Sequence, residues 1–159
     1  MATTELSPQP PQPGRRYFQG AAAILLLTGL AKLFSSLGTA EIFEVLDPVF
    51  ILKFRYVLVG VGLVELAVAT VLLCGLHWEL KALLTLWIGG SFAIYRVGLV
   101  MLDFDAPCPC VGSVAKSLGV SEKVTRLGTA SAMLYLLVGS TVLLAVHRVR
   151  KKQTVSPVI

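Results

Sequence analysis

Four long apolar segments dominate the chain and limit what it can fold into. They cover residues 18–37, 56–76, 82–102 and 127–146 of the 159. Each is close to the ~20 residues that an α-helix, rising ~1.5 Å per residue, needs to cross the hydrocarbon core of a bilayer. Strands of a transmembrane barrel would be ~10-residue segments of alternating polarity, whereas these segments are continuously apolar. The sequence therefore predicts an all-α protein, an integral membrane four-helix bundle with the lipid bilayer as its partner.

The composition supports one membrane domain with polar ends. Hydrophobic residues make up 55% of the chain and charged residues only 14%, too little polar surface for a soluble globule of this length. Residues 1–16 hold four prolines among mostly polar residues, which predicts a disordered N-terminal tail. Residues 17–147 are the predicted transmembrane domain, and residues 148–159 a basic cytoplasmic tail.

Basic residues are distributed unevenly about the four segments. Seven of the 14 lysines and arginines precede the first segment, join the second to the third, or follow the fourth: Arg15, Arg16, Lys81, Arg148, Arg150, Lys151 and Lys152. The opposite loops carry five, Lys53, Arg55, Lys116, Lys123 and Arg126, and acidic residues offset them. Because cytoplasmic flanks carry the excess of such residues, both termini are predicted to be cytoplasmic. The protein is then a multi-pass protein of the plasma (inner) membrane, and the loop after the third segment faces the periplasm. Topology and anionic lipids explain the basic tail without a nucleic-acid partner.

Three ionisable residues lie inside the apolar segments: Lys32, Glu65 and Arg96. Each costs ~2.5 to 3.5 kcal/mol at the centre of a lone helix, so we expect Glu65 to pair with Lys32, Arg96 or both in the outer half of the membrane. Two interpretations stay open. The cluster either locks the helices together, or forms the floor of a polar pocket that tunes thiols or binds a quinone or another redox partner. Three further polar residues would extend such a pocket: Ser35, Ser91 and Tyr95.

A pair of cysteines, Cys108-Pro109-Cys110, follows the third segment. Thiols one residue apart close only a small strained ring, and strained disulfides tend to be the ones that exchange, so we predict that Cys108 and Cys110 are catalytic redox residues. Two sulfurs cannot fill a tetrahedral zinc site, and both histidines lie at the opposite ends of the segments, so no metal site within one chain is predicted. A transient copper site shared between chains stays open. Cys74, about a bilayer thickness away, is expected to pack as a small apolar residue.

Residues 28–113 resemble the MauE family of methylamine-utilisation membrane proteins, within the wider DoxX-like group of four-helix redox-associated proteins. The matching residues are these: Gly29, Lys32, Pro48, Tyr56, Glu65 and the run Cys108-Pro109-Cys110-Val111-Gly112-Ser113. The C-x-C-x-G ending is the most specific of them. The resemblance implies a part in methylamine dehydrogenase maturation, in which a MauE protein works with an exported thioredoxin-like partner on disulfide formation.

Two functions therefore stay open at the level of the sequence. The first is a membrane redox protein that supports thiol-disulfide exchange through Cys108 and Cys110, as a thiol-disulfide oxidoreductase component. The second is a non-catalytic assembly subunit that stabilises a partner protein. In that case the bond between the two thiols only holds their own loop together. The sequence leaves open a homo-oligomer in either case.

Overall fold

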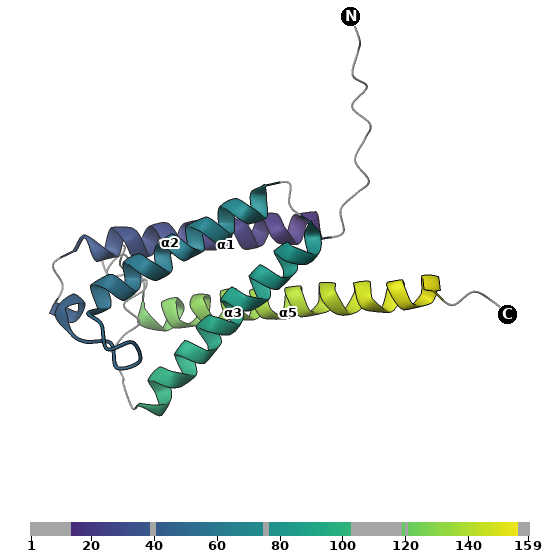
Figure 1. Cartoon of the computed structure of the whole chain (residues 1–159). Coiled ribbons are helices and arrows are strands. Elements are labelled where there is room, and N and C mark those ends of the chain that lie inside the picture. The colour runs from purple at the N-terminus through teal and green to yellow at the C-terminus, as the bar shows by residue number, and fades with distance from the viewer. Residues whose placement is uncertain (1–13, 39–40, 75–76, 103–118, 120, 156–159) are drawn as a thin grey trace, which may run out of the picture.

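The computed structural model describes residues 14–38, 41–74, 77–102, 119 and 121–155. Four long helices cover most of this part of the chain, namely α1 (Arg15–Ser36), α2 (Phe54–Leu73), α3 (Trp78–Met101) and α5 (Glu122–Val155) (Figure 1). A short 3-10 helix, η1 (Glu41–Glu44), lies between α1 and α2. All four long helices are long and apolar enough to span a membrane, α5 through its stretch Lys123–Val149. The predicted all-α architecture with four helices able to span a membrane is confirmed for the described residues.

Each of the four long helices begins before its apolar segment, and α5 also ends beyond its own. α1 begins at Arg15, inside the segment predicted to be a disordered tail, and α3 begins at Trp78 rather than at residue 82. α5 continues to Val155, so it takes in the first part of the basic tail. Apolarity marks the part of a helix that suits lipid, whereas the backbone hydrogen bonds of the helix continue through the polar residues on either side. The remainder of the predicted tails lies outside the described residues.

The bundle has two unlike ends. At one end, here called the terminus end, α1 and α3 begin and α2 and α5 end (Figure 1). At the other, the loop end, α2 and α5 begin and α1 and α3 end. α1 packs along α2, and α3 packs along α5. The contacts between these two pairs of helices are sparser, which leaves room between the pairs.

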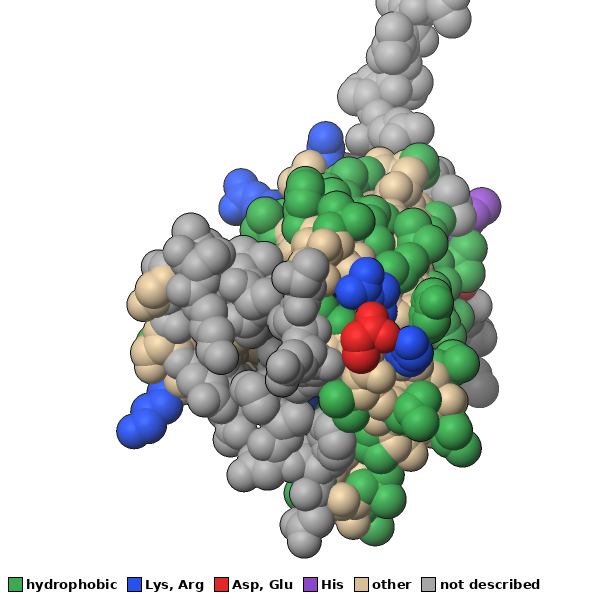
Figure 2. Space-filling view, turned by 90° about the vertical axis from the view of Figure 1, so that its left-hand side faces the viewer, with side chains coloured by type: hydrophobic (Ala, Val, Ile, Leu, Met, Phe, Trp, Pro, Cys, Tyr) green, Lys and Arg blue, Asp and Glu red, His purple; other side chains and the backbone are tan. Residues whose placement is uncertain are grey.

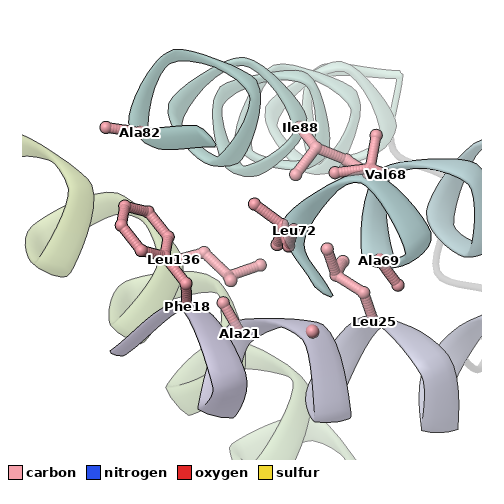
Figure 3. Packing of buried hydrophobic residues seen from close by; sticks show 10 residues of the cluster. Phe18, Ala21, Leu25, Val68, Ala69, Leu72, Ala82, Ile88 and Leu136 are labelled. Carbon is pink, nitrogen blue, oxygen red and sulfur yellow. The ribbon is translucent and has the colours of Figure 1, made fainter. Parts of the chain in front are cut away.

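The hydrophobic core lies towards the terminus end. Figure 3 shows side chains from all four helices meeting there, among them Phe18 and Leu25 of α1, Leu72 of α2, Ile88 of α3 and Leu136 of α5. Small residues such as Ala21, Ala22, Ala69 and Ala82 belong to the same cluster. In a bilayer the lipid tails are as apolar as leucine, so close van der Waals packing of this kind is a main source of helix association.

Two tyrosine–glycine contacts join α1 to α5 at this end. The Tyr17 hydroxyl donates a hydrogen bond of 2.8 Å to the carbonyl oxygen of Leu136. Its ring lies so close to Gly139 that a Cβ atom there would be 2.0 Å from Cε2 of the tyrosine. In return, the hydroxyl of Tyr135 on α5 would be 2.7 Å from a Cβ atom at Gly20 of α1. A side chain at Gly139 would therefore overlap the Tyr17 ring, whereas one at Gly20 would need only the terminal hydroxyl of Tyr135 to shift.

Lys81 and Cys74 are placed differently from what the sequence suggested. Lys81, counted as a loop cation, is buried on the first turn of α3, and its Nζ donates a 2.8 Å hydrogen bond to the carbonyl oxygen of Leu72. The last carbonyls of a helix have no partner within it, and a cation there is favourable, so this contact closes the end of α2. The expectation that Cys74 is packed is wrong: it is exposed, because the helix ends there.

Candidate functional site

A close crossing of α1 and α2 brings two intramembrane charges together. Gly29 and Gly62 face each other at this crossing, and a Cβ atom on either one would lie 3.1 Å from the carbonyl oxygen of the other. The same hypothetical Cβ on Gly29 would be 3.2 Å from Cβ of Glu65. The absence of side chains on both glycines therefore allows the helix backbones to approach, and Glu65 lies beside the first helix.

Lys32 and Glu65 form a buried ion pair at this crossing. Lys32 Nζ lies 2.5 Å from Glu65 Oε1, and both side chains are buried. Side chains on a helix lean towards its N-terminus, so Lys32 can reach back to the level of Gly29 and Glu65. The ammonium group also lies 5.4 Å from the centre of the Phe92 ring of α3, within the range of a cation–π contact. One contact thus joins α1 to α2, and the other joins α1 to α3.

The second carboxylate oxygen of Glu65 lacks a comparable contact. Oε2 is buried and accepts no hydrogen bond within the described part of the chain, because the hydroxyl of the neighbouring Thr28 donates to the carbonyl oxygens of Ile24 and Leu25 instead. Buried carboxylate oxygens nearly always accept a hydrogen bond, so an exception at a buried charge needs a physical explanation.

A cavity of about 510 Å³ lies between the helix pairs in the loop-end half of the bundle. All four long helices contribute to its walls, and most of the lining side chains are apolar. Its polar side chains include both members of the buried pair and three residues of α3: Lys32, Glu65, Ser91, Tyr95 and Arg96. Cavities of 300–1,000 Å³ with apolar walls and a few polar groups are typical binding sites for small molecules.

A hairpin, residues 45–53, lies beside this cavity. Leu46 and Lys53 form an antiparallel bridge, and Ile51 adopts a positive φ of 56°, a backbone conformation uncommon for a β-branched residue. Phe50 and Leu52 of the hairpin line the cavity. The Phe50 ring stacks on Tyr95 of α3 with 5.7 Å between the ring centres.

Asp47 fixes the hairpin to α3, and sequence reasoning did not single it out. Its side chain is fully buried: Oδ2 accepts a hydrogen bond from the Tyr95 hydroxyl, and Oδ1 accepts from the backbone N–H groups of Val49 and Phe50 at 2.8 and 3.0 Å. The signal in the sequence was Asp47-Pro48, because aspartate before proline commonly begins a turn in which its carboxylate binds the backbone two residues on.

The predicted site residues are only partly brought together. Lys32 and Glu65 touch, and Arg96 lines the same cavity, as do Ser91 and Tyr95. Ser35 is buried on α1 and is not part of the cavity wall. Cys108 and Cys110, together with Val111, Gly112 and Ser113, lie outside the described residues. In the residues that the structure does describe, no three histidine, cysteine, aspartate or glutamate side chains gather as metal ligands would.

The surface of the loop end carries an exposed charge cluster. Figure 2, which looks onto this end, shows acidic and basic side chains side by side among hydrophobic ones. Glu44 of η1 accepts a 2.7 Å hydrogen bond from Lys53 and lies 3.5 Å from Arg55. The hydrogen bond and charge of Lys53 lower the pKa of Glu44, and the same contact with Glu44 raises the pKa of Lys53. This pair ties η1 to the base of the hairpin.

In the described residues, fold and site together give a helical bundle of the kind found in multi-pass membrane proteins, with four helices long and apolar enough to span a bilayer and a buried ion pair beside a cavity in the loop-end half. No protein-family model matches the chain, and no match was found among curated proteins or among solved structures.

Proposed function

We propose that this chain is a plasma-membrane protein that supports thiol-disulfide exchange with an exported thioredoxin-like protein through Cys108 and Cys110. The observation that carries the proposal is the position of the pair in the chain. α3 ends at Met101 at the loop end, and Cys108 follows seven residues later. An extended chain gains at most about 3.6 Å per residue, so Cys108 stays within about 25 Å of the end of α3. The cavity and the hairpin lie at that same end.

The asymmetry of the basic residues supports a periplasmic position for the thiols, with both termini in the cytoplasm. A periplasmic position also suits the chemistry, because disulfides form and persist there and are rare in the cytosol. The resemblance to MauE proteins extends the proposal to the maturation of methylamine dehydrogenase, whose disulfides would be handled by the thioredoxin-like partner.

The exchange proceeds through a mixed disulfide. A thiolate of the pair attacks the disulfide of the partner, forms a bond to one sulfur and releases the other as a thiolate. The second cysteine of the pair then attacks the mixed disulfide. The pair is left oxidised as a disulfide and the partner reduced as a dithiol, and the same steps in reverse oxidise the partner.

Single-cysteine variants test this mechanism, because a lone cysteine forms the mixed disulfide but cannot resolve it. Cys108→Ala and Cys110→Ala should be expressed in cells that export the partner. The membrane proteins are then separated by electrophoresis without reductant. We expect at least one variant to accumulate a reductant-sensitive adduct with an exported protein, and Cys74→Ala to accumulate none. If neither single variant forms an adduct, the exchange function is excluded.

A specific surface favours a second candidate, the assembly subunit. The tip of the hairpin exposes large apolar side chains, with Phe50 52% and Ile51 76% exposed, and such surface at a membrane boundary suits a partner protein. The double variant Cys108→Ser with Cys110→Ser separates the two candidates. Full function in that variant would favour assembly, whereas loss of function at normal membrane abundance would favour exchange.

A further inference from the structure

Glu65 lines the cavity and holds there a buried carboxylate oxygen, Oε2, that a ligand could reach after a small rotation of the side chain. The side chain of Glu65 is fully buried, lines the cavity, and has its other oxygen on Lys32. Leaving a buried acceptor without a hydrogen bond costs free energy, and the cost is larger in the core of a bilayer, which holds no water to donate to it. Water alone is a poor solution here, since a buried water needs two to four polar partners and these walls are mostly apolar. The group that fits must carry a hydrogen-bond donor on an otherwise apolar body.

The remaining walls point to a flat ring as that body. Aromatic side chains from α2, α3 and the hairpin line the cavity: Phe50, Phe54, Tyr56, Trp87, Phe92 and Tyr95. Aromatic rings pack against a planar ligand in offset-stacked or edge-to-face arrangements. The volume of about 510 Å³ exceeds that of one ring and leaves space for part of an alkyl chain.

We propose that this cavity binds a hydroquinone with an apolar tail, whose hydroxyl donates to Glu65 Oε2. The terminal torsion of a glutamate side chain is soft, so a small rotation presents Oε2 to the ring without breaking the crossing of α1 and α2. Lys32 and Arg96 also line the cavity and are donors suited to the carbonyl oxygens of the oxidised quinone. A fatty acid fits less well, because its carboxylate would lie against that of Glu65.

The inference goes beyond the proposed function, because binding in the cavity requires neither Cys108 nor Cys110. Where the cavity binds a quinone and Cys108 and Cys110 also exchange, the electron transfer between the dithiol and the quinone balances. The dithiol gives two electrons and two protons to the quinone, and the products are a disulfide and a hydroquinone.

The first test compares two probes on the unaltered protein in nanodiscs. The probes are a tritiated decyl-1,4-benzohydroquinone, kept anaerobic, and its dimethyl ether, which has the same ring and tail but no donor; binding to empty nanodiscs is subtracted. We expect the hydroquinone to bind at least about tenfold more tightly, as a hydrogen bond to a charged acceptor implies. Equal binding of the two probes, or tighter binding of decanoate than of the hydroquinone, would overturn the inference.

The second test places the probe in the cavity. A Cβ atom at Gly60, which lines the cavity, meets no other atom within 4 Å, so Gly60→Phe should fill the cavity without disturbing the core. Gly90 on α3 is equally open but is not part of the wall, so Gly90→Phe is the matched control. We expect Gly60→Phe to weaken hydroquinone binding at least about tenfold while Gly90→Phe retains it. Unchanged binding in Gly60→Phe refutes the site.

A third measurement separates this inference from the exchange function. The double variant Cys108→Ser with Cys110→Ser should bind the hydroquinone as the unaltered protein does, and loss of binding there would overturn the inference. Glu65→Gln should lose the preference for the hydroquinone over its dimethyl ether. If Glu65→Gln fails to fold, the comparison of the two probes on the unaltered protein still decides the question.

Discussion

At the scale of single residues, Glu65 is the position on which the buried charge of the bundle depends. Glu65→Gln removes the anion that neutralises Lys32 and leaves a buried cation on α1. Loss of one partner of a buried pair commonly costs 3–5 kcal/mol in a protein interior, and intramembrane pairs are weaker, so we expect a loss of about 3 kcal/mol. Lys32→Met added to Glu65→Gln should recover about 1 kcal/mol of it. Reversible unfolding in nanodiscs measures the four free energies of the cycle.

The control for that cycle is the exposed pair Glu44–Lys53. Both of its side chains are about half exposed, so solvent screens the contact, and the cycle of Glu44→Gln with Lys53→Met should show a much weaker coupling than the buried pair. If the Lys32–Glu65 cycle is as weakly coupled as this exposed pair, the crossing of α1 and α2 is held by packing at Gly29 and Gly62 and not by the charges.

The same exposed pair makes a prediction about pH. The pKa of Glu44 is lowered by Lys53, so its stabilising contribution is present above the pKa of an unfolded glutamate and is lost as pH falls through the folded value. The pKa of Lys53 is raised, so its contribution is complete below the unfolded lysine value and is lost as pH rises through the folded value. In Lys53→Met the pKa of Glu44 should move up towards its ordinary value. Carbon-detected NMR titration of the Glu44 carboxyl measures this, and an unmoved pKa would show that Arg55 alone is responsible.

At the scale of helices, the packing of α1 on α5 depends on Gly139. A methyl group there would lie 2.0 Å from Cε2 of Tyr17, so Gly139→Ala must push the helices apart or displace the ring that bonds to Leu136. Overpacking of this kind costs about 1–3 kcal/mol. Gly128 on the same helix is open, so Gly128→Ala should be neutral or stabilise by up to about 1 kcal/mol. Thermal unfolding of both variants tests this, and adding Tyr17→Ala to Gly139→Ala should restore part of the loss.

At the scale of the whole molecule, hydrophobicity alone predicted the four spans, because about 20 continuous apolar residues have few stable alternatives in a bilayer. The intramembrane charges predicted that Glu65 needs a cation. They could not select between Lys32 and Arg96, because that choice depends on the crossing of α1 and α2 at Gly29 and Gly62, which is a property of two helices together. The role of Asp47 was hidden for a similar reason: its partner Tyr95 is 48 residues away, on another helix.

The orientation of the whole bundle follows from a measurement on its three cysteines. Cys74 is exposed at the terminus end. Cys108 and Cys110 belong to the connection between α3, which ends at the loop end, and α5, which begins there. Because the excess of basic residues flanks the terminus end, we expect that end in the cytoplasm. After mild reduction, an impermeant thiol reagent should therefore label Cys108 and Cys110 on intact cells, and label Cys74 only once the membrane is opened. Single-cysteine variants assign each signal. Labelling of Cys74 alone on intact cells would invert the bundle and place Cys108 and Cys110 in the reducing cytosol, where a lasting disulfide is not expected.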